Sequence, residues 1–274
     1  MILDVSILWD KACEEEILSL ARQLLLSDAV HRIYLVGSPG ESAPDSERFA
    51  AAGNRAKQRI QYIHTDPHLS RGASYNMAIR ESIYDEVPFH LILSPYIQLT
   101  AQAINNLIAV MQANELIGQL TPSIVDSNGK TLYVCNALPT PADLLRQLFK
   151  TSSDGKRSHR FELRNLDHSR PINAPYLSGL FMLLRTDALL KAGLFDEHFS
   201  AWLNDLDLSR RIHRDFLTIY YPSETLVYTH HSSPNRIPQP LWLYVTDLCR
   251  YFHKWGWLYD SERKLFNNLL LTNS

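Results

Sequence analysis

The 274-residue sequence predicts an α/β fold in which a mostly parallel sheet is flanked by helices and followed by a C-terminal helical extension. Three observations support this class. Strand and helix patterns alternate along the first half, the chain is 45% hydrophobic and 20% charged, and the segment from residue 240 onward is rich in aromatic residues. Alternation of this kind produces parallel strands with helices on both faces of the sheet.

The strands of the first half are expected from short apolar runs, and the helices from apolar residues at helical spacing. Strand patterns occupy residues 3–9, 32–37, 59–65 and 89–94, and a strand, a turn and a second strand follow over 116–134. Helix patterns occupy residues 11–27, 72–84 and 100–114. Because ligands of such sheets bind at the carboxyl ends of the strands, the candidate ligand loops are 37–46, 66–72 and 94–98.

The second half of the chain changes character. Residues 151–175 are polar and lack periodicity, which predicts a long surface loop or flap. Residues 176–185 predict a strand, and Thr186 is expected to cap a short helix that stops at Gly193. Two further short strands are expected over 217–222 and 225–231.

The composition excludes several classes of protein. A net charge of -2 gives no electrostatic footprint for nucleic acid. The three cysteines, Cys13, Cys135 and Cys249, are far apart, which argues against a disulfide framework or a zinc cluster and suits a reducing compartment. The sequence has no apolar run of about 20 residues and no basic region typical of a signal peptide, so we expect a cytoplasmic protein.

Asp205 and Asp207 stand one residue apart where a loop turns into a helix. If that helix begins near Asn204, Asn204 is its N-cap and Asp207 lies at the third position, so both acids could simply stabilise a helix start. Helical spacing separates them, because Asp205 lies within about 60° of the apolar stripe that Leu208 and Ile212 begin, whereas Asp207 points about 200° away from Asp205. Asp205 is therefore expected to face the domain as a candidate general base, and Asp207 to be a capping or outer group.

The segment SGLFMLLRTDALLKAGLFDEHFSAWLNDLDLSRRI, residues 178–212, resembles the family-2 glycosyltransferase pattern that contains G-x-F-D-E-x-F and E-D-x-D-L-x-x-R. The similarity continues in YPSETLVYTHHSS and RYFHKWGWLYDSERKLFN, and upstream in SRGASYNMAIRES. It covers most of the chain and is most specific over 176–216. Within this family the sequence resembles the rhamnosyltransferase-like enzymes of bacterial surface-polysaccharide assembly.

This resemblance implies a GT-A fold with a Rossmann-like sheet. Residues 1–124 would form the nucleotide-sugar-binding half, 125–239 the acceptor-binding half of the same domain, and 240–274 an aromatic C-terminal helical extension. It also implies an inverting glycosyltransferase that moves a sugar, a hexosyl or deoxyhexosyl group, from a nucleotide-sugar donor to a glycan. The acceptor would be a polyprenyl-linked saccharide in O-antigen or capsule-type synthesis.

The resemblance assigns site residues as well. Asp205 matches the base that deprotonates the acceptor hydroxyl, and the acceptor side also includes Gly179, Trp202 and Asn204, the last in place of the family's glutamate. Arg71, Gly72 and Asn76 match the segment near the nucleotide, and His230 matches the histidine that holds the diphosphate or its metal.

Two donor-side carboxylates of the family are missing. Gly37 and Ser38 stand where an Asp-Asn pair contacts the base or ribose, and Ser94 and Tyr96 stand where an aspartate binds a divalent cation, Mg²⁺ or Mn²⁺. Tyr96 is a poor ligand for such a metal. Three explanations stay open: a metal-independent enzyme that uses His230, Arg71 and the 151–170 loop, weak metal binding through His230 and Asp207, or an inactive homologue acting as a scaffold or partner subunit.

The C-terminal extension has two interpretations. A stripe at helical spacing runs through Leu241, Val245, Leu248, Phe252 and Trp255. It predicts either a helix that packs on the core or an amphipathic helix that contacts the inner membrane, where a lipid-linked acceptor would lie.

Overall fold

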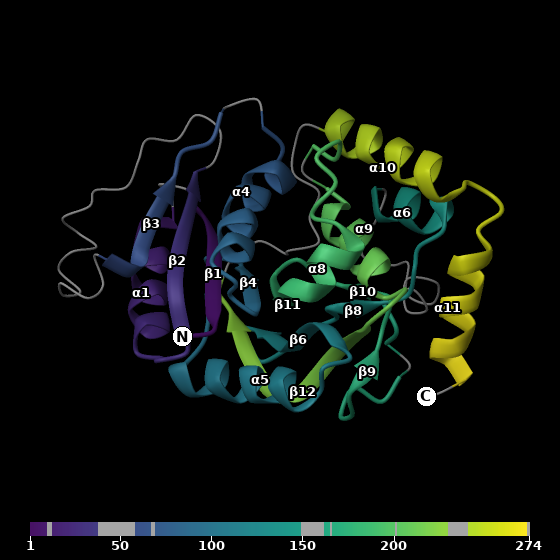
Figure 1. The fold of residues 1–274 in the computed structure, drawn as a ribbon. Coiled ribbons are helices and arrows are strands. Elements are labelled where there is room, and N and C mark those ends of the chain that lie inside the picture. Colours follow the sequence, from purple (N-terminus) through teal and green to yellow (C-terminus); the bar gives the residue numbers. More distant parts are fainter. Residues whose placement is uncertain are drawn as a thin grey trace.

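The computed structural model describes residues 1–9, 13–37, 58–66, 69–148, 162–164, 166–200, 202–229 and 241–272. The strands in these ranges form a ten-stranded sheet with helices on both faces, and a small two-stranded sheet beside it (Figure 1). The main order is β3-β2-β1-β4-β11-β6-β12-β5, with β7 paired to β6 and β9 to β12. The α/β class with a mostly parallel sheet is therefore confirmed.

The first half of the sheet follows the alternation in the sequence. Its strands are β1 (Leu3–Trp9), β2 (Val30–Gly37), β3 (Ile60–Ile63) and β4 (Phe89–Leu93), and all of them pair in parallel. β1 is buried over almost its whole length, as expected for a central strand covered on both faces. The four strand patterns predicted in this half are confirmed to within two residues.

The second half of the sheet contains a reversal. β11 (Phe181–Arg185) lies between β4 and β6 (Ile117–Asp126) and runs antiparallel to both. β12 (Leu217–Tyr228) is parallel to β6, and β5 (Ile97–Gln98) pairs antiparallel at the edge. The short strands are β7 (Thr131–Leu132), β8 (Cys135–Asn136), β9 (Ile172–Asn173) and β10 (Tyr176–Leu177).

Two strand predictions for the second half were wrong in detail. Residues 176–185 are not one strand, since β10 pairs with β8 in the small sheet while β11 joins the main sheet. Residues 217–228 are one strand rather than two, with an irregular register between Tyr221 and Thr225. Both errors arise because pairing partners, not the apolar run itself, decide where a strand ends.

The helices cover the two faces of the sheet. Helices α1 (Glu14–Leu25) and α5 (Ala101–Ala113) pack on one face, and α4 (Arg71–Tyr84), α8 (Thr186–Ala192) and α9 (Asn204–Ile212) pack on the other (Figure 1). The Ser70 hydroxyl caps α4 by accepting from the Ala73 N–H at 3.1 Å, so this helix starts one residue before the predicted Gly72.

The predicted cap of α8 was wrong, although its end was right. Thr186 is the first residue of α8, and its hydroxyl donates to the Val87 carbonyl at 2.5 Å instead of capping the helix. Gly193 follows the helix with φ of 83°, a backbone conformation that favours glycine, and this ends α8 where the sequence predicted.

The C-terminal extension packs on the α9 side of the molecule. It consists of α10 (Leu241–Trp255) and α11 (Ser261–Thr272), and α10 lies beside α6 (Pro141–Leu148) (Figure 1). α10 joins a third hydrophobic cluster with Phe199, Leu203 and Leu206 through its buried face: Tyr244, Leu248, Tyr251 and Phe252. The core-packing interpretation is therefore correct for this face.

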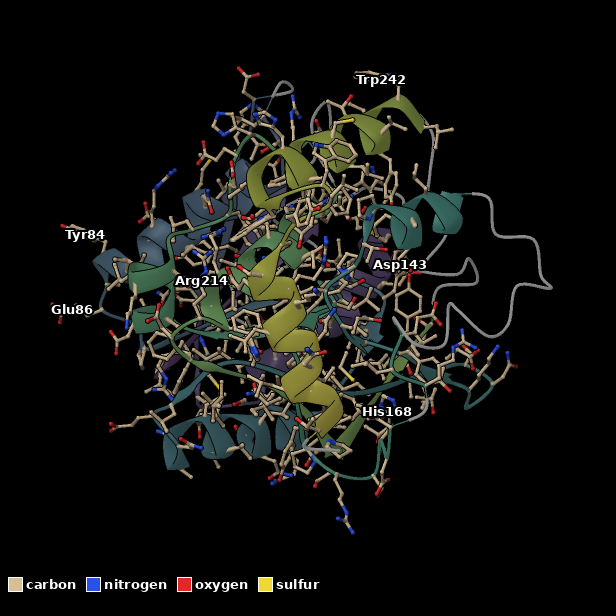
Figure 2. All side chains as sticks on the ribbon, turned by 90° about the vertical axis from the view of Figure 1, so that its right-hand side faces the viewer. Tyr84, Glu86, Asp143, His168, Arg214 and Trp242 are labelled. Atoms are coloured by element: carbon tan, nitrogen blue, oxygen red, sulfur yellow. The ribbon has the colours of Figure 1, made fainter. Side chains whose placement is uncertain are left out.

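The opposite face of α10 carries exposed apolar side chains. Leu241 is 43% exposed, Trp242 64% and Val245 40%, so two members of the predicted stripe face solvent rather than the core. Figure 2 shows Trp242 at the outer rim of the molecule. Within the described ranges, no helix combines the length and apolar character needed to cross a membrane.

Candidate active site

The carboxyl ends of the parallel strands are level along one edge of the sheet. β1 pairs with β2 so that Trp9 lies beside Gly37, and with β4 so that Ile7 lies beside Leu93. The segments that follow Gly37 and Leu93 therefore leave from the same edge, which is where ligands bind in open α/β sheets. Residues 38–46 lie outside the described residues, so the choice of loops 37–46 and 94–98 as ligand loops stays a prediction.

The residues just before β11 reach this same edge. Because β11 is antiparallel to β4, with Phe181 beside Leu93, residues 178–180 lie at the carboxyl end of β4. The Ser94 N–H donates to the Leu180 carbonyl at 2.9 Å. The loop after β4 and the segment containing Gly179 are thus fixed to each other.

Asp205 lies against this segment. Its Oδ2 accepts the Gly179 N–H at 2.8 Å and the Tyr176 hydroxyl at 3.3 Å, and its Oδ1 accepts the Leu206 N–H at 2.9 Å. The side chain is partly exposed. The carboxylate is therefore held at the ligand-binding edge of the sheet and does not point into bulk water.

Burial and hydrogen bonds shift the pKa of this carboxyl group in opposite directions. Burial raises the pKa of Asp205 above its ordinary value, and the hydrogen bonds from Gly179, Leu206 and Tyr176 offset only part of that rise. Burial, followed by the charge of Asp205, also raises the pKa of Tyr176 well above its ordinary value, so Tyr176 stays a neutral donor. A raised pKa makes the ionised Asp205 a stronger base than an exposed aspartate.

Gly179 is close to Asp205 for a steric reason. A Cβ atom added at Gly179 would lie 3.1 Å from Asp205 Oδ2 and 3.2 Å from its Cβ, which is tighter than ordinary side-chain contacts. The absence of a side chain lets the Gly179 N–H reach the carboxylate. The sequence placed Gly179 on the acceptor side, and the structure brings it into direct contact with Asp205.

The start of α9 differs from the predicted capping arrangement. The N-cap is Leu203, whose φ of 60° is left-handed and unusual for a branched side chain. Asn204 is the first residue of the helix, and its Oδ1 accepts the Asp205 N–H at 2.8 Å. Strained backbone of this kind clusters at functional sites, and here it stands two residues before Asp205.

α4 meets the acceptor side through its first turns. Arg71 donates its backbone N–H to the Ser200 carbonyl at 3.2 Å, and its guanidinium lies 5.9 Å from the centre of the Trp202 ring. The Arg71 side chain is exposed and forms no ion pair with any described residue. A Cβ atom added at Gly72 would lie 3.0 Å from that of Phe195, so this glycine allows the close approach.

Asn76 holds α4 to the segment before α9. Its Nδ2 donates to the Phe195 carbonyl and to Glu197 Oε1, both at 2.9 Å, and its Oδ1 accepts the Phe195 N–H at 3.0 Å. The side chain is buried. The amide is thus engaged by protein groups, and it acts on the site by fixing Arg71 and Gly72 relative to the 195–197 segment.

The donor-side positions that depart from the family are occupied by aromatic groups. The Tyr62 hydroxyl lies where a side chain on Gly37 would begin, so a carboxylate at this position would require Tyr62 to move. The Tyr96 ring stands 6.1 Å from that of Tyr228, edge to face, and its carbonyl accepts the Thr229 N–H at 2.9 Å. Ser38 and His230 lie outside the described residues.

The described residues do not fit a metal-binding set. Nowhere in the described ranges do three or more His, Cys, Asp or Glu side chains converge closely enough to hold a metal ion. Asp207, which the sequence left as a candidate ligand, is buried and lies 2.8 Å from Arg211 and 2.9 Å from Lys254. A carboxylate already neutralised by two cations is a poor ligand for a divalent metal.

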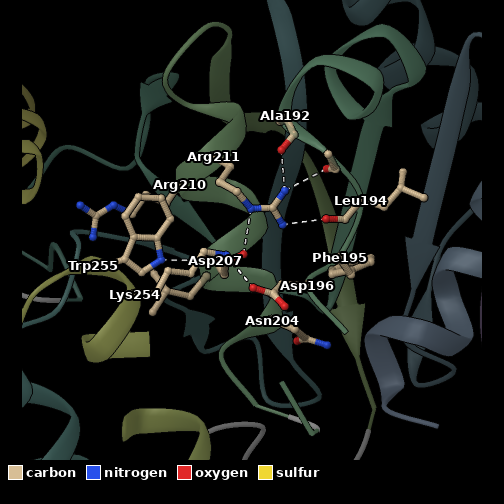
Figure 3. A network of polar contacts seen from close by, with 12 residues as sticks. Ala192, Leu194, Phe195, Asp196, Asn204, Asp207, Arg210, Arg211, Lys254 and Trp255 are labelled. Atoms are coloured by element: carbon tan, nitrogen blue, oxygen red, sulfur yellow. Dashed lines mark hydrogen bonds and ion pairs between the residues drawn. The ribbon is translucent and has the colours of Figure 1, made fainter. Parts of the chain in front are cut away.

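Asp207 instead joins α9 to the C-terminal extension (Figure 3). Its Oδ2 accepts from Arg211 Nε, and its Oδ1 accepts from Trp255 Nε1 at 2.8 Å and contacts Lys254 Nζ. The Arg210 guanidinium lies 4.0 Å from the centre of the Trp255 ring. The two aspartates therefore diverge as helical spacing predicted, but Asp207 is an ion-pair centre rather than a helix cap.

Sequence reasoning missed two residues that shape the site. Tyr176 donates to Asp205, and Asp247 on α10 accepts the Ser200 N–H at 2.9 Å and the Trp202 N–H at 3.0 Å. Tyr176 stands at the start of the segment most similar to the family, which is a usable signal. The sequence contains no comparable signal for Asp247, because an acidic residue beside an apolar stripe is normally exposed to solvent.

Comparisons with known proteins come from structure alone. No family model matches the chain, and no curated protein does. The similar solved structures include GalNAc-T7 with UDP, GalNAc and Mn²⁺, with a TM-score of 0.58, 11% sequence identity and coverage of 84% of this chain and 44% of that one. They also include the mannosyltransferase PcManGT from Pyrobaculum calidifontis in complex with GDP-Man and Mn²⁺, with a TM-score of 0.54, 14% identity and coverage of 92% and 63%.

The chain spans less than two thirds of the length of either structure. At these identities the likeness concerns the fold. The chain therefore has the GT-A fold of glycosyltransferases.

Proposed function

We propose that this protein is an inverting glycosyltransferase that uses Asp205 as its general base. The observation that carries the proposal is the Asp205 carboxylate, held by Gly179 and Tyr176 at the ligand-binding edge of the sheet with its pKa raised by burial. A hydrogen-bonded carboxylate at the mouth of such a sheet is suited to accept a proton from an incoming hydroxyl. The similarity of residues 178–212 to the family-2 pattern supports the same role.

The proposed reaction is a single displacement. The acceptor hydroxyl oxygen attacks the anomeric carbon of the donor sugar while its proton passes to Asp205. The bond between the anomeric carbon and the diphosphate oxygen breaks, and its electron pair leaves with the nucleoside diphosphate. Because attack and departure occur on opposite faces of the sugar, its anomeric configuration inverts.

The donor side would be formed by the first turn of α4 and the loop after β4. Arg71 supplies an exposed positive charge at the N-terminus of α4, and helix N-termini favour anionic groups. Gly37, Ser94 and Tyr96 lie at the same edge, and His230 follows Thr229 in the chain. Both similar solved structures contain a nucleotide or nucleotide-sugar together with Mn²⁺, which supports a nucleotide-sugar donor here.

The identity of the acceptor is a finer proposal. The similarity to rhamnosyltransferase-like sequences supports a hexosyl or deoxyhexosyl group as the transferred sugar and a polyprenyl-linked saccharide of bacterial surface polysaccharide as the acceptor. The exposed apolar side chains of Leu241, Trp242 and Val245 offer a surface for contact with the membrane that would carry such an acceptor.

Nucleotide binding tests the proposed function directly. The melting temperature is measured with UDP, dTDP and GDP, each with and without Mn²⁺. A ligand that binds the folded state raises the melting temperature, so we expect one nucleotide to raise it by several degrees. A shift without Mn²⁺ supports a metal-independent enzyme, and a shift that requires Mn²⁺ supports a metal site. No shift with any of the three would favour the inactive partner subunit, an alternative that the missing carboxylates at Gly37 and Tyr96 keep open.

A further inference from the structure

The hydroxyl of Tyr244 is a buried polar group without a partner among the described residues. Tyr244 is 3% exposed, and its oxygen makes no hydrogen bond to any residue that the structure describes. Buried hydroxyls are nearly always hydrogen-bonded in native proteins, and an isolated one is costly compared with the phenyl ring of phenylalanine. Such a group calls for a partner that arrives from outside the protein.

This hydroxyl belongs to the surroundings of Asp205. Tyr244 shares a hydrophobic cluster with Leu206, the residue after Asp205, and Tyr176, whose hydroxyl donates to Asp205 at 3.3 Å, packs against the same cluster. Burial, followed by the negative charge of Asp205, raises the pKa of Tyr244, which agrees with this placement. The Tyr244 ring stands 6.2 Å from the Trp202 ring in an edge-to-face contact. Groups from β10, α9, α10 and the loop before α9 are thus neighbours: the hydroxyls of Tyr176 and Tyr244, the Asp205 carboxylate and the Trp202 ring.

Hydrogen bonds fix the backbone around this region, whereas the described residues hold the Trp202 side chain by ring contacts alone, with Tyr244 and with the Arg71 guanidinium. One helical turn after Tyr244, the buried Asp247 carboxylate accepts the N–H groups of Ser200 and Trp202 and so holds α10 to the loop before α9. The Trp202 indole N–H makes no hydrogen bond to a described residue, and the ring is partly exposed. Rotation of Trp202 would therefore break no hydrogen bond to a described residue, although its ring would give up its contacts with Tyr244 and the Arg71 guanidinium.

We propose that Tyr244 is an acceptor-binding residue, whose hydroxyl bonds a sugar hydroxyl adjacent to the one that Asp205 deprotonates, once Trp202 has turned to lie against the sugar ring. The inference rests on the proposed function and narrows its acceptor to a saccharide with neighbouring hydroxyl groups. A phenol hydroxyl suits this task because it both donates and accepts. An aromatic ring beside it gives the sugar an apolar face to rest on.

The test compares two buried tyrosines of α10. In Tyr244→Phe an unpartnered hydroxyl is removed, whereas in Tyr251→Phe the hydroxyl that accepts from Arg210 at 3.3 Å is removed. We expect Tyr244→Phe to melt at or above the wild-type temperature and Tyr251→Phe to melt lower. If both lowered the melting temperature equally, the Tyr244 hydroxyl would have a partner in the free protein and the inference would fail.

Activity is measured with the nucleotide-sugars of the nucleotide that raises the melting temperature. Their hydrolysis by water, followed as nucleoside diphosphate release, requires the donor site and a base but no acceptor sugar. Methyl glycosides of glucose, galactose, mannose and rhamnose then serve as acceptor probes. We expect Tyr244→Phe to hydrolyse donor at the wild-type rate while its KM for the accepted methyl glycoside rises about tenfold, the effect of losing one hydrogen bond. Tyr251→Phe should keep the wild-type KM.

A deoxy acceptor sharpens the result. For the wild type, a methyl glycoside that lacks the hydroxyl next to the transfer position should have a raised KM. This rise should equal the rise that Tyr244→Phe shows with the full acceptor, and the two effects should not add when they are combined. An unchanged acceptor KM in Tyr244→Phe, or additive losses, would overturn the assignment of Tyr244 and leave the proposed function standing. If wild type neither hydrolysed any nucleotide-sugar nor transferred its sugar to any acceptor probe, the proposed function would fail and this inference with it.

Discussion

Asp205 illustrates how one residue combines a chemical requirement with a local structural cost. Its carboxylate is desolvated, which raises its pKa, yet it receives three hydrogen bonds that keep it oriented. Leu203 adopts a left-handed backbone just before it, and Gly179 leaves out a side chain to admit it. The burial of the carboxylate and the left-handed Leu203 favour orientation of Asp205 over stability of the fold, a trade that is common at functional sites.

The role proposed for Asp205 leads to a prediction for activity. Asp205→Asn keeps the volume but cannot take a proton, so we expect sugar transfer to fall at least a hundredfold, within the range typical of lost general bases. The melting-temperature shift caused by the bound nucleotide should remain, because the substitution lies on the acceptor side. Turnover is measured with the donor that binds. A variant that kept wild-type turnover would rule out Asp205 as the base.

The same residue sets the expected dependence on pH. Only ionised Asp205 accepts a proton, so wild-type kcat/KM should fall as the pH drops through its raised pKa, at a higher pH than for an ordinary aspartate. The contribution of Asp205 to the free energy of unfolding depends on pH in the opposite direction to the rate, because the folded state holds the proton more tightly than the unfolded chain does. That contribution is present below the ordinary pKa of 3.8 and is lost as the pH rises through the folded value. If kcat/KM did not change as the pH was lowered through this range, Asp205 would not be the general base.

A residue's role could be predicted from the sequence when its contacts lie nearby along the chain, and not when they lie far along it. Helical spacing was enough to point Asp205 and Asp207 in different directions, because that depends only on neighbours along the chain. The capping role expected for Asn204 was wrong, since tertiary packing imposes a left-handed Leu203 that no local pattern favours. Tyr244 and Asp247 could not be identified, because their partners lie more than 40 positions away, at Trp202 and Ser200.

At the scale of elements, the C-terminal helices are part of the domain. α10 holds α9 through Trp255 and Lys254, which both contact the buried Asp207. The start of α11 is also held to α9, because Asp260, just before α11, receives two hydrogen bonds from Arg210 of α9, at 2.8 and 2.6 Å. The position of Asp205 therefore depends on residues that come long after it in the sequence.

Asp207 should accordingly contribute far more to stability than an exposed acid. Removing one member of a buried ion pair leaves an uncompensated charge, so we expect Asp207→Asn to lower the free energy of unfolding by about 3 kcal/mol. Asp215→Asn is the matched control, since Asp215 pairs with Lys191 at 2.8 Å in an exposed position and should cost about 0.5 kcal/mol. Urea unfolding measures both. Equal losses in the two variants would mean that the Asp207 network is not a stabilising centre.

At the scale of the whole molecule, the sequence predicted the parallel half of the sheet and missed the reversal. Alternating strands and helices force parallel pairing, because each helix returns the chain to the starting edge. An apolar run such as residues 181–185 reads the same in either direction, so nothing local marks β11 as antiparallel. The family resemblance implied the GT-A architecture. Only the structure shows the contacts that make residues 178–180 and 205 neighbours.

The outer surface leads to a prediction about membranes. Trp242 is 64% exposed beside Leu241 and Val245, whereas the net charge of -2 gives no general attraction to anionic lipid. Sedimentation with vesicles of phosphatidylcholine and phosphatidylglycerol should therefore show binding that resists salt, and Trp242→Ser should weaken it about tenfold by loss of buried apolar area. Tyr84→Ser, which removes an exposed aromatic ring on α4 far from this surface, is the control (Figure 2). Equal binding by the two variants would exclude α10 as the contact.

The reversed strand has a consequence for how this chain is made. β4 gains its second neighbour only when residues 181–185 arrive to form β11. While the ribosome translates everything between them, the nascent N-terminal half carries an apolar strand with one row of backbone groups unpaired, the kind of edge that recruits other chains. Aggregation therefore threatens this protein chiefly during its synthesis, in the interval before the closing strand emerges.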